Sequence, residues 1–150
     1  MLPEKTREQF EKVVESQLAR IQAMKDQGDF VDYSKLDKII IGVCGGDGIG
    51  PMITSMAQHV LETLLADKVK AGKVEFRVID GLTIERRAEL GCAIPPDVME
   101  ELKACHVILK GPTTTPRKGD PWPNVESANV AMRKALDLFA NVRPVKVPEL

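Results

Sequence analysis

The sequence predicts an α/β fold in which parallel strands are joined by crossover helices, with one further helix at the N-terminus. Three short runs rich in β-branched and other apolar residues alternate with segments whose apolar residues recur every three or four positions. The first run, IIIGVC at 39–44, has no polar alternation, which is typical of a strand buried on both faces. Strands that alternate with helices in this way form a parallel sheet.

Composition and charge exclude several classes of protein. The 150 residues include 21 Lys and Arg against 22 Asp and Glu, so the net charge of −1 indicates neither nucleic acid nor an anionic membrane as a partner. No apolar run approaches the roughly 18 residues of a membrane span, and the mixed charges of the first residues are unlike a targeting peptide. Three cysteines without a C-x-x-C motif argue against a disulfide framework or a structural zinc site, and they favour the cytoplasm.

Residues 1–38 form a predicted N-terminal extension, consisting of a helix and a polar connector. A single apolar stripe indicates an amphipathic helix over 6–27, and Gly28 supplies a stop. Such a helix is expected to dock on its own domain or on a partner. The stripe contains Phe10, Val13, Val14, Leu18, Ile21 and Met24.

Residues 39–150 form the predicted α/β part. After the strand at 39–44 we expect a glycine-rich turn, a helix from Pro51 to about residue 65, and a strand at 74–80. One or two helices follow between 81 and 104, then a strand at 106–109. The loop at 112–126 holds four prolines and the single Trp, and irregular loops of this length are usually functional. A helix from about Ser127 to Leu136 and an extended segment at 139–147 complete the chain.

The glycine-rich turn at 45–50 follows a strand and precedes a helix, which is the position of a dinucleotide-binding loop. That fingerprint requires glycines at positions one, three and six. Counted from Gly46, the sixth position is Pro51, and counted from Gly48 it is Ile53. The fingerprint therefore fails, and we interpret the turn as a tight connection that needs positive φ angles.

A group of polar side chains near the end of the chain forms the strongest candidate site. Asn129 and Arg133 are four positions apart and share one helix face, and Ser127 occupies the N-cap position. Arg143 follows in the extended segment. Forked arginine donors with a hydroxyl and an amide suit a small polycarboxylate. A capped surface helix with solvated arginines is the alternative that spacing alone leaves open.

The chain resembles the isocitrate/isopropylmalate dehydrogenase family over about residues 39–147. The resemblance rests on several motifs in the same order along the chain. These are GDGIGP at 46–51, LKGP at 109–112, TTP at 114–116, SxNVAMR at 127–133 and LDLFANVRP at 136–144.

The resemblance implies oxidative decarboxylation of a 2-hydroxy acid with NAD or NADP and Mg²⁺ or Mn²⁺. By position, Arg133 and Arg143 match the family arginines that bind the substrate carboxylates. Ser127 and Asn129 match the pair that meets the distal carboxylate of isocitrate, where isopropylmalate enzymes have apolar residues. Thr114 matches a threonine near the nicotinamide end of the cofactor, and Lys110 belongs to the motif beneath it.

The resemblance also implies that this chain is an incomplete version of the fold. The family's catalytic tyrosine and lysine, a third substrate arginine and the metal-binding aspartates lie downstream of residue 150. We therefore assign no catalytic residue and no metal ligand within this chain, and we give Asp47, Asp80 and Asp137 structural roles. We expect the chain alone to be inactive and to associate as a homo-oligomer or with a complementing chain. The alternative is a non-catalytic half-protein or a regulatory module that senses isocitrate.

Overall fold

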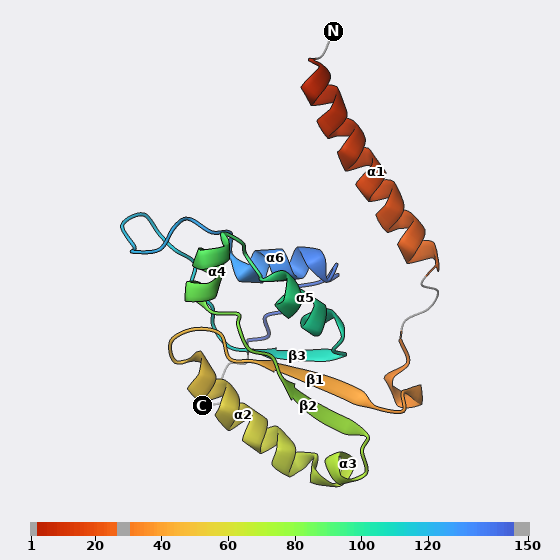
Figure 1. Ribbon diagram of the computed structural model, residues 1–150. Coiled ribbons are helices and arrows are strands. Elements are labelled where there is room, and N and C mark those ends of the chain that lie inside the picture. The colour runs from red at the N-terminus through yellow and green to blue at the C-terminus, as the bar shows by residue number, and fades with distance from the viewer. Residues whose placement is uncertain (1–2, 27–30, 146–150) are drawn as a thin grey trace. The chain divides into compact units, whose positions relative to one another are not determined.

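The computed structural model describes residues 3–26 and 31–145 and divides the chain into two compact units, Met1–Lys35 and Leu36–Leu150 (Figure 1). Each unit is described here by itself. The division predicted from the sequence, after residue 38, stays a proposal about domains. No helix within the described ranges is long and apolar enough to cross a membrane.

The first unit consists of the helix α1 (Glu4–Asp26) and the short 3₁₀ helix η1 (Tyr33–Lys35). The predicted N-terminal helix is therefore present, but it begins earlier than residue 6. The reason is that the Pro3 carbonyl accepts hydrogen bonds from the N–H groups of Thr6 and Arg7, which closes the first turn. No residue of α1 is buried. Gly28, the predicted stop, lies outside the described residues.

The second unit is built on a sheet of three parallel strands, as the sequence predicts. The strands are β1 (Ile39–Cys44), β2 (Val74–Val78) and β3 (Val107–Lys110), in the order β2-β1-β3. Ile41 on the central strand lies opposite Phe76 on one side and Val107 on the other. The last four residues of β1 are buried, in agreement with its unbroken apolar pattern.

Helices cover both faces of this sheet (Figure 1). One face carries α2 (Gly50–Leu64) and α3 (Ala66–Lys70), and the other carries α4 (Ile84–Leu90), α5 (Pro96–Lys103) and α6 (Ala128–Ala135). The main hydrophobic core lies on the second side of the sheet. There the sheet and the segment that follows β2 pack on α5 and α6. Its buried members are Cys44, Ile79, Leu82, Ile94, Val98, Leu102, Ala128 and Met132.

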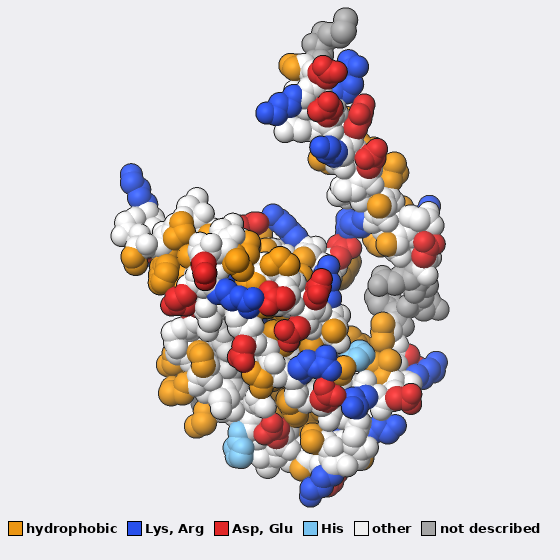
Figure 2. Space-filling view, in the orientation of Figure 1, with side chains coloured by type: hydrophobic (Ala, Val, Ile, Leu, Met, Phe, Trp, Pro, Cys, Tyr) orange, Lys and Arg blue, Asp and Glu red, His pale blue; other side chains and the backbone are white. Residues whose placement is uncertain are grey.

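Helix α2 carries apolar side chains at helical spacing, but several of them lie at the surface. Met56 is 69% and Leu64 74% exposed, whereas Thr54 is buried. The sheet covers one side of the helix, and no second layer covers the outer side within the described part of the chain. Hydrophobic side chains are visible on the surface in Figure 2.

The remaining elements follow local sequence signals. The N–H of Arg86 donates to the Thr83 hydroxyl at the start of α4, and Gly91 ends that helix with φ of +62°. Helix α6 agrees with the predicted span from Ser127 to Leu136. The extended segment predicted at 139–147 forms no strand over its described part, 139–145, where every residue is exposed. An extended pattern specifies a strand only when a neighbouring strand supplies hydrogen-bond partners.

Candidate functional site

The candidate site lies where the carboxyl ends of the three strands meet. Because the strands are parallel, β1, β2 and β3 all end at one edge of the sheet. Three connections leave from this edge: the glycine-rich turn after β1, the segment 79–83 after β2 and the loop 111–127 after β3. Open α/β sheets generally bind ligands at this edge.

The glycine-rich turn packs directly on the loop that follows β3. Gly46 has φ of +72°, and a Cβ atom there would overlap the Pro112 carbonyl oxygen. A Cβ atom on Gly111 would likewise overlap the Gly45 carbonyl. The Asp47 N–H donates to the Pro112 carbonyl at 2.8 Å. These glycines therefore permit close approach of two backbones, which agrees with our interpretation of the turn as a tight connection.

The Asp47 side chain joins the glycine-rich turn to two other segments. Its Oδ1 accepts a hydrogen bond from the Ile84 N–H at 2.7 Å, at the start of α4. Its Oδ2 accepts from the Thr114 N–H at 2.6 Å. A carboxylate that accepts two backbone N–H groups is a strong, charge-assisted anchor. Asp47 thereby positions the TTP segment, in keeping with the structural role assigned from the sequence.

Arg87 is a fully buried cation that joins three loop segments. Its guanidinium donates from Nε to the Ala93 carbonyl at 2.7 Å, from Nη1 to the Thr114 carbonyl at 2.8 Å and from Nη2 to the Glu126 carbonyl at 2.9 Å. Burial lowers the pKa of Arg87, and the charge of Asp47 acts in the opposite direction. The backbone of Thr114 is thus held on both sides of its Cα, through the N–H by Asp47 and through the carbonyl by Arg87.

Arg87 also holds the two candidate binding segments close to each other. Thr114 belongs to the proposed cofactor side, and Glu126 immediately precedes Ser127 on the proposed substrate side. Because one guanidinium bonds both carbonyls, the long loop between these residues begins and ends at the same place. No motif in the sequence assigns Arg87 a role. The only available signal is that Arg87 lies three positions after Ile84, on the apolar face of a short helix.

Lys110 lies at the end of β3 and is half-buried. Its ammonium donates to the Gly111 carbonyl at 2.8 Å and to the Thr113 hydroxyl at 3.0 Å. Burial lowers the pKa of Lys110, and the charge of Arg87 acts in the same direction. In this geometry Lys110 supports the LKGP turn, while the predicted cofactor role of Lys110 stays a prediction.

The predicted substrate residues fall into two groups. Asn129 and Arg133 lie exposed on one face of α6, and Ser127 precedes the helix without forming a side-chain cap hydrogen bond. Arg143 lies in the exposed segment after α6. Neither guanidinium, of Arg133 or of Arg143, forms an ion pair with any residue in 3–26 or 31–145. Three of the four residues are therefore grouped by α6, and Arg143 is not held by regular structure.

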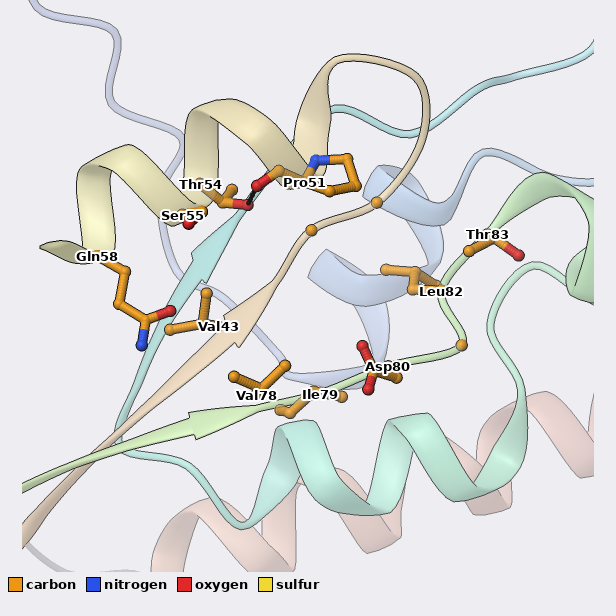
Figure 3. Close-up of a pocket in the computed structure, with 13 residues that line it drawn as sticks. Val43, Pro51, Thr54, Ser55, Gln58, Val78, Ile79, Asp80, Leu82 and Thr83 are labelled. Atoms are coloured by element: carbon orange, nitrogen blue, oxygen red, sulfur yellow. Dashed lines mark hydrogen bonds between the residues drawn. The ribbon is translucent and has the colours of Figure 1, made fainter.

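A cavity of about 300 Å³ opens at this edge of the sheet, between α2 and the end of β2. Figure 3 shows Thr54, Ser55 and Gln58 of α2 on one side and Val78, Ile79 and Asp80 on the other. Thr54 already donates to the Gly50 carbonyl and Gln58 to Glu62, so these polar groups serve the helix itself. None of the six predicted binding residues lines this cavity.

Within residues 3–26 and 31–145, no group of three His, Cys, Asp or Glu side chains lies close enough together to hold a metal ion. The described residues of this chain thus do not by themselves fit a divalent metal site.

Replacing Asp47 with asparagine is expected to lower the free energy of unfolding by about 1.5–3 kcal/mol, because the amide nitrogen cannot accept a backbone hydrogen bond. Chemical denaturation measures the loss, and faster hydrogen exchange at Ile84 and Thr114 locates it. Asp80→Asn is the control, since Asp80 is exposed. Equal effects of the two substitutions would contradict the anchoring role of Asp47.

The fold and the site together define a class. A parallel α/β unit has its glycine-rich turn packed against the loop after β3 at the carboxyl edge of the sheet. Two arginines that form no ion pair within the described part of the chain follow, one in α6 and one after it. A family profile described as isocitrate/isopropylmalate dehydrogenase matches residues 40–150. The chain belongs to this family.

Individual relatives agree with the family match. The chain is 40% identical over 113 residues to the "Isocitrate dehydrogenase [NADP]" of Caldococcus noboribetus, covering 73% of this chain and 25% of that protein. It is 36% identical over 109 residues to the "3-isopropylmalate dehydrogenase" of Anaeromyxobacter dehalogenans, covering 71% and 30%. The apo crystal structure of a beta-decarboxylating dehydrogenase from Thermococcus kodakarensis matches with a TM-score of 0.51 and 33% identity, covering 66% and 27%. The chain therefore spans between a quarter and a third of the length of these relatives.

Proposed function

We propose that this chain is the N-terminal portion of an NAD(P)-dependent isocitrate dehydrogenase-like enzyme, which converts isocitrate oxidatively to 2-oxoglutarate and CO₂. In this proposal the chain supplies substrate-carboxylate binding. The observation that carries the proposal is the hydrogen bonding of Arg87 to both Thr114 and Glu126. These bonds bring the TTP motif beside the start of the SxNVAMR motif, at the sheet edge where α/β proteins bind ligands.

The proposed substrate contacts follow from the chemistry of the side chains. Arg133 and Arg143 each offer a planar fork of N–H donors that matches a carboxylate. The Ser127 hydroxyl and the Asn129 amide add donors of fixed direction near the start of α6, where the positive end of the helix dipole also favours an anion. This set favours a tricarboxylate such as isocitrate over isopropylmalate, whose isopropyl group needs apolar neighbours.

Thr114 is proposed to lie at the nicotinamide end of the cofactor. NAD or NADP would serve there as the hydride acceptor, and Mg²⁺ or Mn²⁺ would supply a Lewis acid for the decarboxylation. Asp47 and Arg87 hold the Thr114 peptide from both sides, so the hydroxyl is presented from a fixed backbone. The metal ligands are proposed to come from outside this chain. We place the enzyme in the cytoplasm as a homo-oligomer.

The test of this proposal compares the chain with a complete enzyme. The pure chain of 150 residues is expected to form no NAD(P)H with isocitrate, NAD(P) and Mg²⁺, because this proposal places the acid/base pair and the metal ligands outside the chain. A complete dehydrogenase that contains this sequence is expected to form NAD(P)H with isocitrate. Turnover by the chain alone, or a complete enzyme that prefers isopropylmalate, would refute the proposal in its stated form.

The second candidate is a half-protein that pairs with a complementing chain. It is favoured by the exposed apolar face of α2 and by the two edges of the small sheet, which are surfaces that proteins normally cover. The mass of the native polypeptide separates the two candidates. A mass near 16.5 kDa favours the half-protein, and a much larger mass favours the N-terminal portion of one enzyme.

Replacing Ser127 with alanine is expected to reduce kcat/KM for isocitrate by on the order of tenfold to a hundredfold in the complete enzyme, with little loss of stability. Stability is spared because the Ser127 side chain forms no cap hydrogen bond. Thr83→Ala is the matched control, since Thr83 does cap α4 and its loss should cost about 0.5–1 kcal/mol. Ser127→Thr should keep activity with isocitrate. If kcat/KM for isocitrate is unchanged in Ser127→Ala, then Ser127 does not have the assigned role.

A further inference from the structure

Helix α1 exposes an apolar face that lies outside the part of the chain matched by the enzyme family. Phe10 is 67% exposed, Leu18 59% and Met24 56%, and none of the residues of α1 is buried. Figure 2 shows hydrophobic side chains between charged ones along this helix. Most of the stability of a helix in a protein comes from packing of its apolar face, and α1 buries none of its 23 residues.

The apolar residues of α1 follow a heptad pattern, which is the pattern of helices that pair with helices. Val14 and Ile21 occupy position a of the heptad, and Phe10, Gln17 and Met24 occupy position d. These two sets of residues together form the seam of the helix. Val13 and Leu18 flank this seam on its two sides. The opposite side of the helix carries Lys5, Lys12, Ala19 and Asp26.

The ends of the seam favour a second copy that runs in the antiparallel direction. In this register Gln17 of each copy lies level with Val14 of the other. Phe10 then lies level with Ile21 of the other copy, and Arg7 lies level with Met24. The same register places Glu4 of each copy beside Lys25 of the other, so the opposite charges meet twice. A parallel pair would instead bring the two Arg7 side chains together and would place Lys25 beside Arg20 of the other copy.

We propose that α1 pairs with α1 of a second copy of this chain as an antiparallel two-stranded coiled coil. The apolar seam provides the attraction. The exposed charges contribute little energy but determine the direction and the register. Gln17 of each copy lies near the centre of the pair, level with Val14 of the other copy. This pairing does not depend on the proposed enzyme function, because it concerns residues before the matched range 40–150.

Zero-length carbodiimide cross-linking of Glu4 to Lys25 tests the pairing directly. On one helix these residues lie about 32 Å apart at about 1.5 Å per residue, so they cannot be joined within a chain. An equal mixture of isotope-labelled and unlabelled full chains is expected to give Glu4–Lys25 links between labelled and unlabelled copies. Links between Glu8 and Lys12, four positions apart on one helix, confirm that the reagent has reacted.

Absence of the mixed Glu4–Lys25 link, with the Glu8–Lys12 link present, would overturn the proposal. Links from α1 to residues 36–145 within one chain would show that the helix docks on its own domain instead, and they would also overturn it. Loss of enzyme activity has no bearing on either result, so failure of this proposal is distinguishable from failure of the proposed function.

Two sets of variants, studied by sedimentation of the full chain, test the seam and the direction. Ile21→Asp is expected to weaken self-association more than about tenfold, because it places a charge in the seam. Ala19→Asp introduces the same residue on the opposite side and should leave self-association unchanged. Lys25→Glu should weaken the pair, and adding Glu4→Lys should restore it. Equal association of Ile21→Asp and Ala19→Asp, or no recovery in the double variant, would refute the coiled coil.

Discussion

Replacing Arg87 with methionine is expected to lower the free energy of unfolding by about 3–5 kcal/mol. Methionine fills similar space but donates no hydrogen bond, so it leaves the carbonyls of Ala93, Thr114 and Glu126 without their partner. These hydrogen bonds are partly buried, so water replaces the lost donor only in part, and the unpaired carbonyls are costly. The loop 112–126 should also exchange its amide hydrogens faster, since Arg87 joins its two ends.

The neighbouring arginine supplies a matched control for this experiment. Arg86 lies at the surface and pairs with Asp97 at 2.7 Å, with both side chains substantially exposed. Arg86→Met is therefore expected to cost at most about 1 kcal/mol, as exposed ion pairs do. Arg87→Lys should fall between the two, because an ammonium keeps the charge but does not reproduce the planar fork. Chemical denaturation that gives equal losses for Arg86→Met and Arg87→Met would show that the three hydrogen bonds do not stabilise the fold.

The parallel sheet could be predicted from the sequence because its signals are local. The unbroken apolar run at 39–44 indicates a strand buried on both faces, and the helical periodicity that follows requires a crossover. Helix α6 was likewise evident from its length and its N-cap position. The failed dinucleotide fingerprint at 46–51 correctly indicated a turn that serves backbone packing.

The burial of Arg87 could not be predicted, because it depends on where distant carbonyls arrive in space. The carbonyls of Thr114 and Glu126 are supplied by a loop that lies well beyond Arg87 in the chain. Helical spacing places Arg87 on the same face as Ile84, and Arg87 is fully buried, whereas the Arg86 side chain is 39% exposed. That spacing does not say which carbonyls meet the guanidinium, because the tertiary arrangement supplies them.

The exposed face of α2 shows a second limit of sequence patterns. Periodicity identifies which side of a helix is apolar, but it does not say what covers that side. Met56 and Leu64 are apolar at the expected spacing and are nevertheless exposed in the described part of the chain. The segment at 139–145 is a similar case, since its residues favour an extended conformation and no neighbouring strand pairs with them here.

Replacing Arg133 with alanine is expected to weaken isocitrate binding by on the order of a hundredfold to a thousandfold in the complete enzyme. A bidentate contact with a carboxylate contributes about two charge-assisted hydrogen bonds, and each factor of ten corresponds to about 1.4 kcal/mol. Arg133 is exposed and makes no ion pair among the described residues, so its removal should change the free energy of unfolding by less than about 0.5 kcal/mol. Loss of binding with unchanged stability separates a ligand-binding role from a structural one.

The adjacent Lys134 provides the control for charge. Lys134→Ala removes the same charge from the same helix, but Lys134 already pairs with Glu126 at 3.0 Å and points away from the Asn129 face. Titration calorimetry should therefore find isocitrate affinity nearly unchanged in Lys134→Ala, and Arg133→Lys should recover only part of the loss because it lacks the fork. If Arg133→Ala binds isocitrate as tightly as the unmodified enzyme, then α6 is a solvated surface helix, and the substrate carboxylates must be bound by other residues.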